Sequence, residues 1–367
     1  MDKNKELIQK YTLEAIELLK QLIATRSFSG QEHGTAELIH QWLTSRGVTT
    51  NRQGNNVWAT NLHVDPAKPT LLLNSHHDTV QPNQGYTRDP YLPEVVDGRL
   101  YGLGSNDAGG ALVSLMAVFM AFYHEVDLTH NLVLAATAEE ENSGPNGLVG
   151  LLNTLPHIDV AIVGEPTQMQ LAIAEKGLVV FDGVVEGTAS HAAHPNEDNP
   201  IYGAIPVLEW FKNYRFDRVS PQLGPVKITV TQIQAGVQHN AVPAQLHLVV
   251  DVRVNECYTN AEIAGQLQAD APCTLTPRSL RLNSSGIAPQ HPLVLSGLAL
   301  GRTTYGSPTL SDQAVLSCPS LKMGPGDSTR SHSADEFIYL DELLEAPEIY
   351  VQLLNPFLKP QDHETLG

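Results

Sequence analysis

The sequence predicts an α/β fold, in which a mostly parallel sheet lies between layers of helices and a smaller α+β domain is inserted. Two patterns lead to this expectation. In the first half of the chain, short continuous apolar runs alternate with longer helical patterns, as in parallel sheets that are covered on both faces. From about residue 176 the pattern changes to alternating, β-rich runs, which are typical of antiparallel sheets with one exposed face.

The first half of the chain supplies the elements of a three-layer domain. Amphipathic or apolar helical patterns cover roughly 3–25, 32–46 and 111–124. Short apolar or β-rich runs, most of them ending in polar residues, predict strands at 56–62, 70–75, 131–137 and 159–163. Because strands and helices alternate, we expect a mostly parallel sheet in the core of this domain.

We place an inserted domain at 176–283. Its expected strands are at 178–186, 226–233 and 244–253, and its expected helices are at 199–213 and 260–269. This β-α-β-β-α order fits a small, ferredoxin-like antiparallel sheet with two helices on one face. Segments 1–175 and 284–367 then form the main domain, which ends with helices at 291–300 and 341–355.

Composition excludes some partners and compartments. The 367 residues are 42% hydrophobic and 17% charged, as in a soluble globular protein, and the formal net charge of −18 argues against nucleic acid and anionic membranes. Cys257, Cys273 and Cys318 are too few and too far apart for a disulfide framework and indicate free thiols. Charged residues interrupt the N-terminal helical pattern and no apolar run approaches the length of a bilayer span, so we expect a cytoplasmic protein.

Acidic side chains and a histidine follow three predicted strands of the main domain. They are His76 and Asp78, the triplet Glu139-Glu140-Glu141, and Glu165. Because ligands gather at the carboxyl ends of strands in open parallel sheets, we expect these side chains to meet. Adjacent carboxylates repel one another unless they share a cation or a proton, and a divalent metal ion would supply that charge. Taken alone, each motif also fits a solvated loop or an exposed acidic turn.

Two glycine-rich segments contribute further residues of the kind that bind metals. Asp107 lies in the segment 102–110, just before a long buried helix, and could either bridge two cations or cap that helix. A phosphate-binding loop is disfavoured because this segment lacks a Gly-Lys-Ser/Thr ending. His332 lies in the second segment, at 324–337. Together with the residues at the strand ends, they predict a metal-dependent hydrolase.

The ordered motifs resemble those of the M20 family of co-catalytic zinc amidohydrolases, most closely its acetylornithine deacetylase and succinyl-diaminopimelate desuccinylase members. The motifs are HHD at 76–78, GLGSNDAGG at 102–110, AEEEN at 138–142, GEPT at 164–167 and GPGDSTRSHSADEF at 324–337. The resemblance extends from about residue 15 to 355. It implies a main domain that carries two divalent metal ions, zinc or alternatively cobalt.

The resemblance also assigns roles within the metal site. One ion would be held by His76, Asp107 and Glu165, and the other by Asp107, Glu141 and His332, so that Asp107 bridges the two. Glu140 matches the general base of the family. Asp78 matches the residue that orients the imidazole of His76, which needs an acceptor for its second ring nitrogen.

In the inserted domain the resemblance implies a lid that forms a homodimer. His191, in the segment 187–195, would cross the dimer interface and donate a hydrogen bond to the oxyanion, although His194 lies close by. Asn240 and Arg253 would grip the carboxylate of the substrate, for which a planar guanidinium is well suited.

Arg330 lies beside His332, and its role has two interpretations. It could contact a second carboxylate of the substrate, such as that of an N-succinyl group, or it could pair with Asp327 or Asp335 in a structural ion pair.

The implied reaction is hydrolysis of a small N-acyl amino acid, with N-acetyl-L-ornithine, from arginine biosynthesis, as the first expectation. N-succinyl-ornithine, N-acetyl-citrulline and succinyl-diaminopimelate are alternatives, as are the di- and tripeptides cleaved by M20 peptidases. A non-catalytic homologue is disfavoured because Glu140 and every ligand position are retained.

Overall fold

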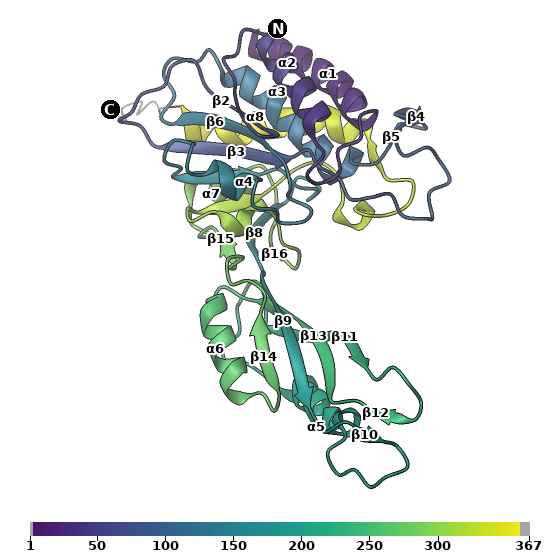
Figure 1. Ribbon diagram of the computed structural model, residues 1–367. Coiled ribbons are helices and arrows are strands. Elements are labelled where there is room, and N and C mark those ends of the chain that lie inside the picture. Colours follow the sequence, from purple (N-terminus) through teal and green to yellow (C-terminus); the bar gives the residue numbers. More distant parts are fainter. Residues whose placement is uncertain (1–2, 360–367) are drawn as a thin grey trace. The chain divides into compact units, whose positions relative to one another are not determined.

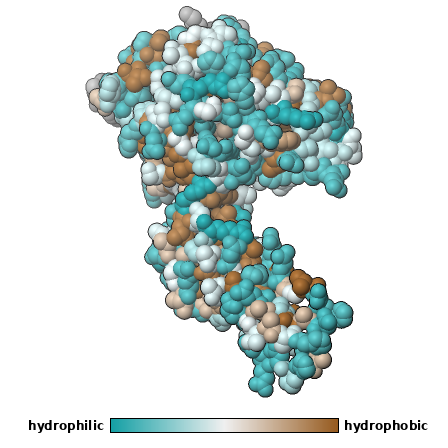
Figure 2. Space-filling model, viewed as in Figure 1, coloured by the Kyte–Doolittle hydropathy of each residue, from teal (hydrophilic) through white to brown (hydrophobic). Residues whose placement is uncertain are grey.

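The computed structural model describes residues 3–359, and the chain divides into two compact units (Figure 1). The first unit extends to Ile173 and also includes Ile287–Tyr305 and the chain from Ser311 onward. The second unit comprises Ala174–Gly286 and Gly306–Leu310. The face that Figure 2 shows is largely hydrophilic, in keeping with the excess of acidic residues.

A nine-stranded sheet forms the centre of the fold, in the order β1-β2-β6-β3-β7-β17-β8-β15 with β16 beside β8. Its central strands are parallel, and they are β6 (Asn131–Thr137), β3 (Thr70–His76), β7 (Val160–Val163) and β17 (Ser320–Lys322). The strands outside this centre are β1 (Asn51–Gln53), β2 (Asn56–Thr60), β8 (Leu171–Glu175), β15 (Ser285–Gly286) and β16 (Thr304–Ser307). The predicted α/β class with a mostly parallel central sheet is therefore confirmed.

Helices cover both faces of this sheet in the first unit. On one face pack α1 (Lys3–Ile23), α2 (His33–Thr44), α3 (Gly110–Phe122), α7 (Pro292–Ala299) and α8 (Leu340–Leu358). On the other face lies the short α4 (Leu148–Leu151) (Figure 1). Leu71 and Leu73 of β3 point into the first layer and Leu72 into the second. Because both faces are covered, this strand is a continuous apolar run rather than an alternating one.

The expectation that no apolar run approaches the length of a membrane span was wrong. The helical stretch Ser105–Phe122 is long and apolar enough to cross a bilayer, but 89% of it is buried inside the protein. Its apolar residues pack against α1, α8 and the central sheet. A helix that is apolar on all sides fits such a central position in a globular core.

The second unit contains a four-stranded antiparallel sheet in the order β11-β13-β9-β14. The strands are β9 (Gly177–Glu186), β11 (Lys227–Ala235), β13 (Gln245–Val254) and β14 (Thr274–Pro277). The helices α5 (Pro200–Asn213) and α6 (Asn260–Asp270) pack on one face of it, as the sequence predicts. The strand β14 was not expected, because four residues with two threonines and a proline carry little β-pattern.

A small three-stranded sheet links two segments that carry predicted ligands. It consists of β18 (Phe337–Tyr339), β5 (Arg99–Tyr101) and β4 (Glu94–Val96). Because β5 leads into the segment of Asp107 and β18 follows the loop of His332, their antiparallel pairing brings these segments together.

Candidate active site

The predicted ligands of the main domain lie at one edge of the central sheet. His76 is the last residue of β3 and is in register with Thr137, the last residue of the parallel strand β6. On the other side β3 pairs in parallel with β7, which ends at Val163. The acidic triplet and Glu165 follow these two strands, so their side chains emerge where open α/β sheets bind ligands.

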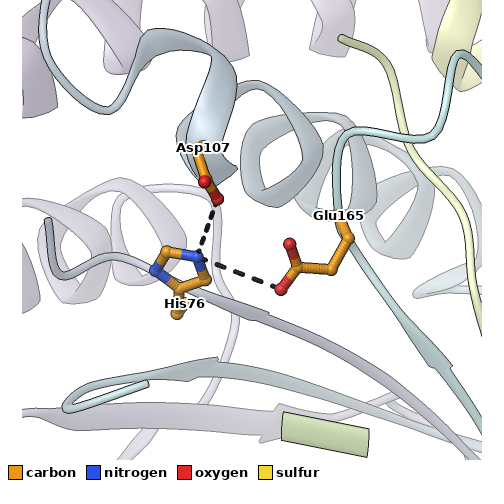
Figure 3. Close-up of side chains that lie close together, drawn as sticks. All are labelled: His76, Asp107 and Glu165. Carbon is orange, nitrogen blue, oxygen red and sulfur yellow. Dashed lines mark ion pairs between the residues drawn. The ribbon is translucent and has the colours of Figure 1, made fainter. Parts of the chain in front are cut away.

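His76 is a buried imidazole with one unpartnered nitrogen. Its Nδ1 is 3.0 Å from the backbone carbonyl oxygen of Asp78 and 3.4 Å from Oδ1 of that residue, so the carbonyl is the nearer acceptor. The Nε2 atom has no hydrogen-bond partner among the residues that the structure describes. This atom faces Asp107 and Glu165 (Figure 3), and it is 3.4 Å from Oδ1 of Asp107 and 4.0 Å from Oε1 of Glu165.

This first group has the composition and spacing of a cation site. Two ligand atoms that are each about 2.1 Å from one tetrahedral ion are about 3.4 Å from each other. Nε2 of His76 and Oδ1 of Asp107 have this separation, 3.4 Å. The lone pair on Nε2 and the two carboxylates are the donors that divalent ions such as zinc accept. A cation would also remove the cost of the unpartnered buried nitrogen.

A second group shares Asp107 with the first. The Nε2 atom of His332 is 3.0 Å from Oε2 of Glu141 and 3.7 Å from Oδ2 of Asp107. In each group the ligand atoms lie within 4.8 Å of one another. Asp107 thus turns one oxygen toward His76 and the other toward His332. The structure brings together the two predicted ligand sets, while their role in binding metal stays a prediction.

Glu140 belongs to neither of these groups. Its Oε2 is 3.9 Å from Nε2 of His76, and its side chain is 12% exposed. Burial raises the pKa of Glu140 well above its usual range, and the charges of Glu165, Asp312 and Glu141 add to this effect against His76. Glu140 thus lies next to the two ligand groups but outside them, and its role as general base stays a prediction.

The electrostatics of the site show an excess of negative charge. Burial, followed by the charge of Asp107, raises the pKa of Glu165 to about 8. Burial also raises the pKa of Asp312 to about 6. The pKa of His332 rises to about 9, mainly because it is hydrogen-bonded to Glu141. Cations would stabilise the ionised carboxylates and reverse these upward shifts.

Buried carboxylates hold the turn that carries the acidic triplet. The two oxygens of Asp78 accept hydrogen bonds from the backbone amides of Glu140 and Glu141, both at 3.1 Å, and one also accepts the hydroxyl of Ser29 at 2.7 Å. Glu32, which is completely buried, accepts the amide of Glu139 at 3.2 Å. No sequence pattern pointed to Glu32 or Ser29, because Glu32 acts on the backbone amide of Glu139 and Ser29 on the carboxylate of Asp78, both far along the chain.

Arg330 forms an ion pair that was not expected. Its guanidinium donates to both carboxylate oxygens of Glu342, at 2.9 and 2.6 Å, and lies over the ring of Phe337. Asp335, one of the two partners considered from the sequence, accepts hydrogen bonds from Thr87 instead. A contact between Arg330 and substrate stays a prediction.

Two of the predicted residues of the second unit, His191 and Asn240, lie on adjacent segments, and the third, Arg253, lies on β13. β10 (Ser190–His191) pairs with β12 (Ala241–Val242), and the amide of Ala192 donates to the carbonyl of Asn240 at 2.9 Å. His191 is exposed, with its ring centre 5.7 Å from that of His194. Arg253 of β13 donates to both oxygens of Asp251, at 2.9 and 3.1 Å. The expected substrate contacts of these residues stay predictions.

Three comparisons with known proteins bear on this site. The pattern that describes peptidase family M20/M25/M40 matches residues 72–355. A succinyl-diaminopimelate desuccinylase of Stenotrophomonas maltophilia (strain R551-3) is 25% identical over 374 residues, which cover 94% of this chain and 99% of that protein.

Solved structures share the fold. An M20 family metallo-carboxypeptidase of Sulfolobus solfataricus has a TM-score of 0.73 at 17% identity, covering 93% of this chain and 98% of its own. A dinuclear metal-binding peptidase from the M20 family of Bacillus subtilis has a TM-score of 0.72 at 15% identity, covering 95% of this chain and 99% of its own.

Proposed function

The chain belongs to peptidase family M20/M25/M40, and we propose that it is a two-metal amidohydrolase that removes the acyl group from a small N-acyl amino acid. The observation that carries this proposal is the pair of ligand groups that share Asp107, with Glu140 beside them and in neither. N-acetyl-L-ornithine is the first substrate to test.

A second candidate is the removal of a succinyl group, as from succinyl-diaminopimelate. It is favoured by the name of the curated relatives, which are succinyl-diaminopimelate desuccinylases at 22–26% identity. In this structure Arg330 is engaged with Glu342, so recognition of a second carboxylate through Arg330 would require this ion pair to open. The same chemistry would also serve a tripeptidase, such as the Staphylococcus aureus protein that shares the fold with a TM-score of 0.74.

The donor set fits two divalent ions. His76, Asp107 and Glu165 would hold one, and Asp107, Glu141 and His332 the other. Imidazole and carboxylate ligands suit zinc, and they also suit cobalt and manganese. When bound, such a pair of ions lowers the pKa of a water molecule and polarises the carbonyl of the scissile amide.

The side chains of the protein move and position the proton. Glu140 takes a proton from the attacking water on its carboxylate and returns it to the nitrogen of the leaving amine. Asp78 and Glu32 keep that carboxylate in place because they hold the amides of residues 139–141. General acid–base catalysis of this kind is typically worth about 10²–10⁴ in rate.

Residues of the second unit provide recognition in this proposal. Asn240 and Arg253 bind the carboxylate of the substrate, which then competes with Asp251 for the guanidinium. His191 donates a hydrogen bond to the oxyanion from the partner subunit of a homodimer. The dimer is supported by the exposed apolar residues of α5 and of β11, an edge strand that can pair with another chain. These residues are Ile201, Tyr202, Ile205 and Ile233.

The test is a substrate panel with controlled metal content. Chelator-treated protein is reloaded with Zn²⁺ or Co²⁺ and assayed with N-acetyl-ornithine, N-acetyl-citrulline, N-succinyl-ornithine, succinyl-diaminopimelate and simple di- and tripeptides. We expect hydrolysis of an N-acyl amino acid that is lost with chelator and restored by metal. Faster cleavage of peptides would identify a peptidase instead. If the protein binds two ions and cleaves no member of the panel, the catalytic proposal is wrong.

A further inference from the structure

Glu336 is a buried carboxylate that contacts the backbone of a predicted metal ligand. The residue is 2% exposed and stands four positions after His332, just before β18. Its Oε1 accepts hydrogen bonds from the amides of Asn106 and Asp107, at 2.8 and 3.0 Å. Its Oε2 accepts the amide of Gly104 at 3.2 Å. Glu336 therefore connects the loop of His332 to the segment that ends in Asp107.

The backbone of Glu336 strengthens the same connection. Its carbonyl oxygen accepts the amide of Gly102 at 2.9 Å, and the following residue, Phe337, pairs with Tyr101 in the small sheet. Four amides between Gly102 and Asp107 thus donate to one residue. A backbone amide that is hydrogen-bonded to a buried acceptor restricts the chain around it. These four bonds therefore fix the backbone position from which the side chain of Asp107 projects.

A carboxylate is a costly way to fill this position. Burying a charge is unfavourable unless hydrogen bonds compensate for the lost water, and the nearby carboxylate of Asp107 adds repulsion. An apolar side chain of similar size would fill the space without this repulsion, but it would accept none of the three side-chain hydrogen bonds. The benefit of the carboxylate is a defined position for the Asp107 segment.

We propose that Glu336 is a positioning residue that fixes Asp107 relative to His332, so that one aspartate can serve both metal ions. This inference rests on the proposed two-metal function. Binding of the second ion should depend on Glu336 more than binding of the first ion does. Asp107 and His332, two of the three second-group ligands, lie on the segments that Glu336 connects. In the first group, by contrast, His76 is the last residue of β3 and Glu165 follows β7.

The neighbouring residue provides a matched control. Asp335 is in the same loop, but its carboxylate accepts hydrogen bonds from the amides of Thr87 and Arg88, both at 2.9 Å. It anchors the loop without contacting the segment of Asp107. An Asp335→Asn variant therefore measures what a weaker anchor does to the loop in general, and Glu336→Gln measures the effect of the connection to Asp107.

The experiment is calorimetric titration of chelator-treated protein with Zn²⁺, combined with amide hydrogen exchange in the absence of metal. For Glu336→Gln we expect the second ion to bind about 10–100-fold more weakly, the range for residues that orient metal ligands. The first ion should lose less affinity. The amides of Gly104, Asn106 and Asp107 should exchange faster in this variant, and both readouts should stay near wild type in Asp335→Asn.

The outcomes separate the inference from the function on which it rests. If folded Glu336→Gln binds both ions as wild type does and its three amides exchange at the wild-type rate, the inference is overturned. If the wild-type protein binds no second ion, the two-metal function fails instead. Should Glu336→Gln not fold, the same titration is made on Glu336→Asp. The shorter carboxylate of this variant cannot reach both the amide of Gly104 and the amides of Asn106 and Asp107. Weaker binding of the second ion then supports the inference, and wild-type affinity for both ions overturns it.

Discussion

Replacing Glu140 with glutamine should remove catalysis while leaving both metal ions in place. The carboxylate of Glu140 is outside both ligand groups, with Oε2 3.9 Å from Nε2 of His76. Glutamine has nearly the same shape but cannot take a proton from water. Loss of general acid–base catalysis lowers kcat by about 10²–10⁴, which corresponds to about 2.7–5.4 kcal/mol of transition-state stabilisation.

Glu141→Gln is the matched variant, because it makes the same change one residue along the chain. Glu141 is a member of the second ligand group, 3.0 Å from His332, so this variant should lose affinity for one ion. The assay is kcat on the best substrate of the panel, together with the number of ions bound per chain. The reasoning is refuted if Glu140→Gln loses an ion and keeps its turnover, or if the two variants behave alike.

Three further predictions follow from individual contacts and pKa shifts. Asp78→Ala leaves the amides of Glu140 and Glu141 without their acceptor, which costs about 1–3 kcal/mol for each amide. Urea denaturation should therefore show a free energy of unfolding that is lower by roughly 2–6 kcal/mol. An unchanged midpoint would contradict this. Folding raises the pKa of Glu165 from 4.5 to about 8 and that of His332 from 6.5 to about 9. The stability that each of these two groups contributes is fully present below its pKa in the unfolded chain, and it is lost as the pH rises through its pKa in the folded protein. The Tm of chelator-treated protein should therefore fall between pH 6 and 9. Bound Zn²⁺ should abolish this fall, because the ligands bind the ion in their deprotonated form. If the Tm falls with pH equally steeply with and without metal, the result counts against the site. Arg253→Ala should raise KM far more than it lowers kcat for substrates with a free carboxylate, and an equal effect on a substrate amide would exclude carboxylate recognition.

Long periodic elements were predictable from the sequence, and short ones were not. The strand at 131–137 and the helix at 199–213 lie within a residue of their observed bounds because apolar or amphipathic patterns define them. β4, β5 and β18 are three residues long, and β17 also has only three. Such strands are determined by their partners in the sheet, which a single sequence does not reveal.

In the candidate site, too, some residues were predictable from the sequence and others were not. The predicted ligands stand out because carboxylates and histidines follow apolar strands, where side chains of other kinds are more common. The residues that hold these ligands were not recognisable in the same way. Glu32 and Glu336 act on backbone amides at positions up to 232 residues away, and any residue type except proline can supply an amide. Asp78 was expected to orient His76, but its hydrogen bonds to the amides of Glu140 and Glu141 were not expected. Only the folded chain shows these contacts.

The excess of buried acid was partly visible in the sequence. The acidic triplet predicts that a cation is needed, because adjacent carboxylates repel one another. The structure adds Asp312, which accepts the hydroxyl of Thr137 at 2.7 Å, and places it among the charges that raise the pKa of Glu140. The number of carboxylates that surround one imidazole depends on how the loops meet, so it could not be read from their order along the chain.

The most direct measurement is the anomalous diffraction of a crystal grown with Zn²⁺. Two peaks about 3.5–4 Å apart are expected, one next to His76 and Glu165 and the other next to Glu141 and His332, with Asp107 between them and Glu140 coordinating neither. A single peak, or a pair of peaks in which Glu140 replaces one of these ligands, would contradict the assignment of both the metal site and the base.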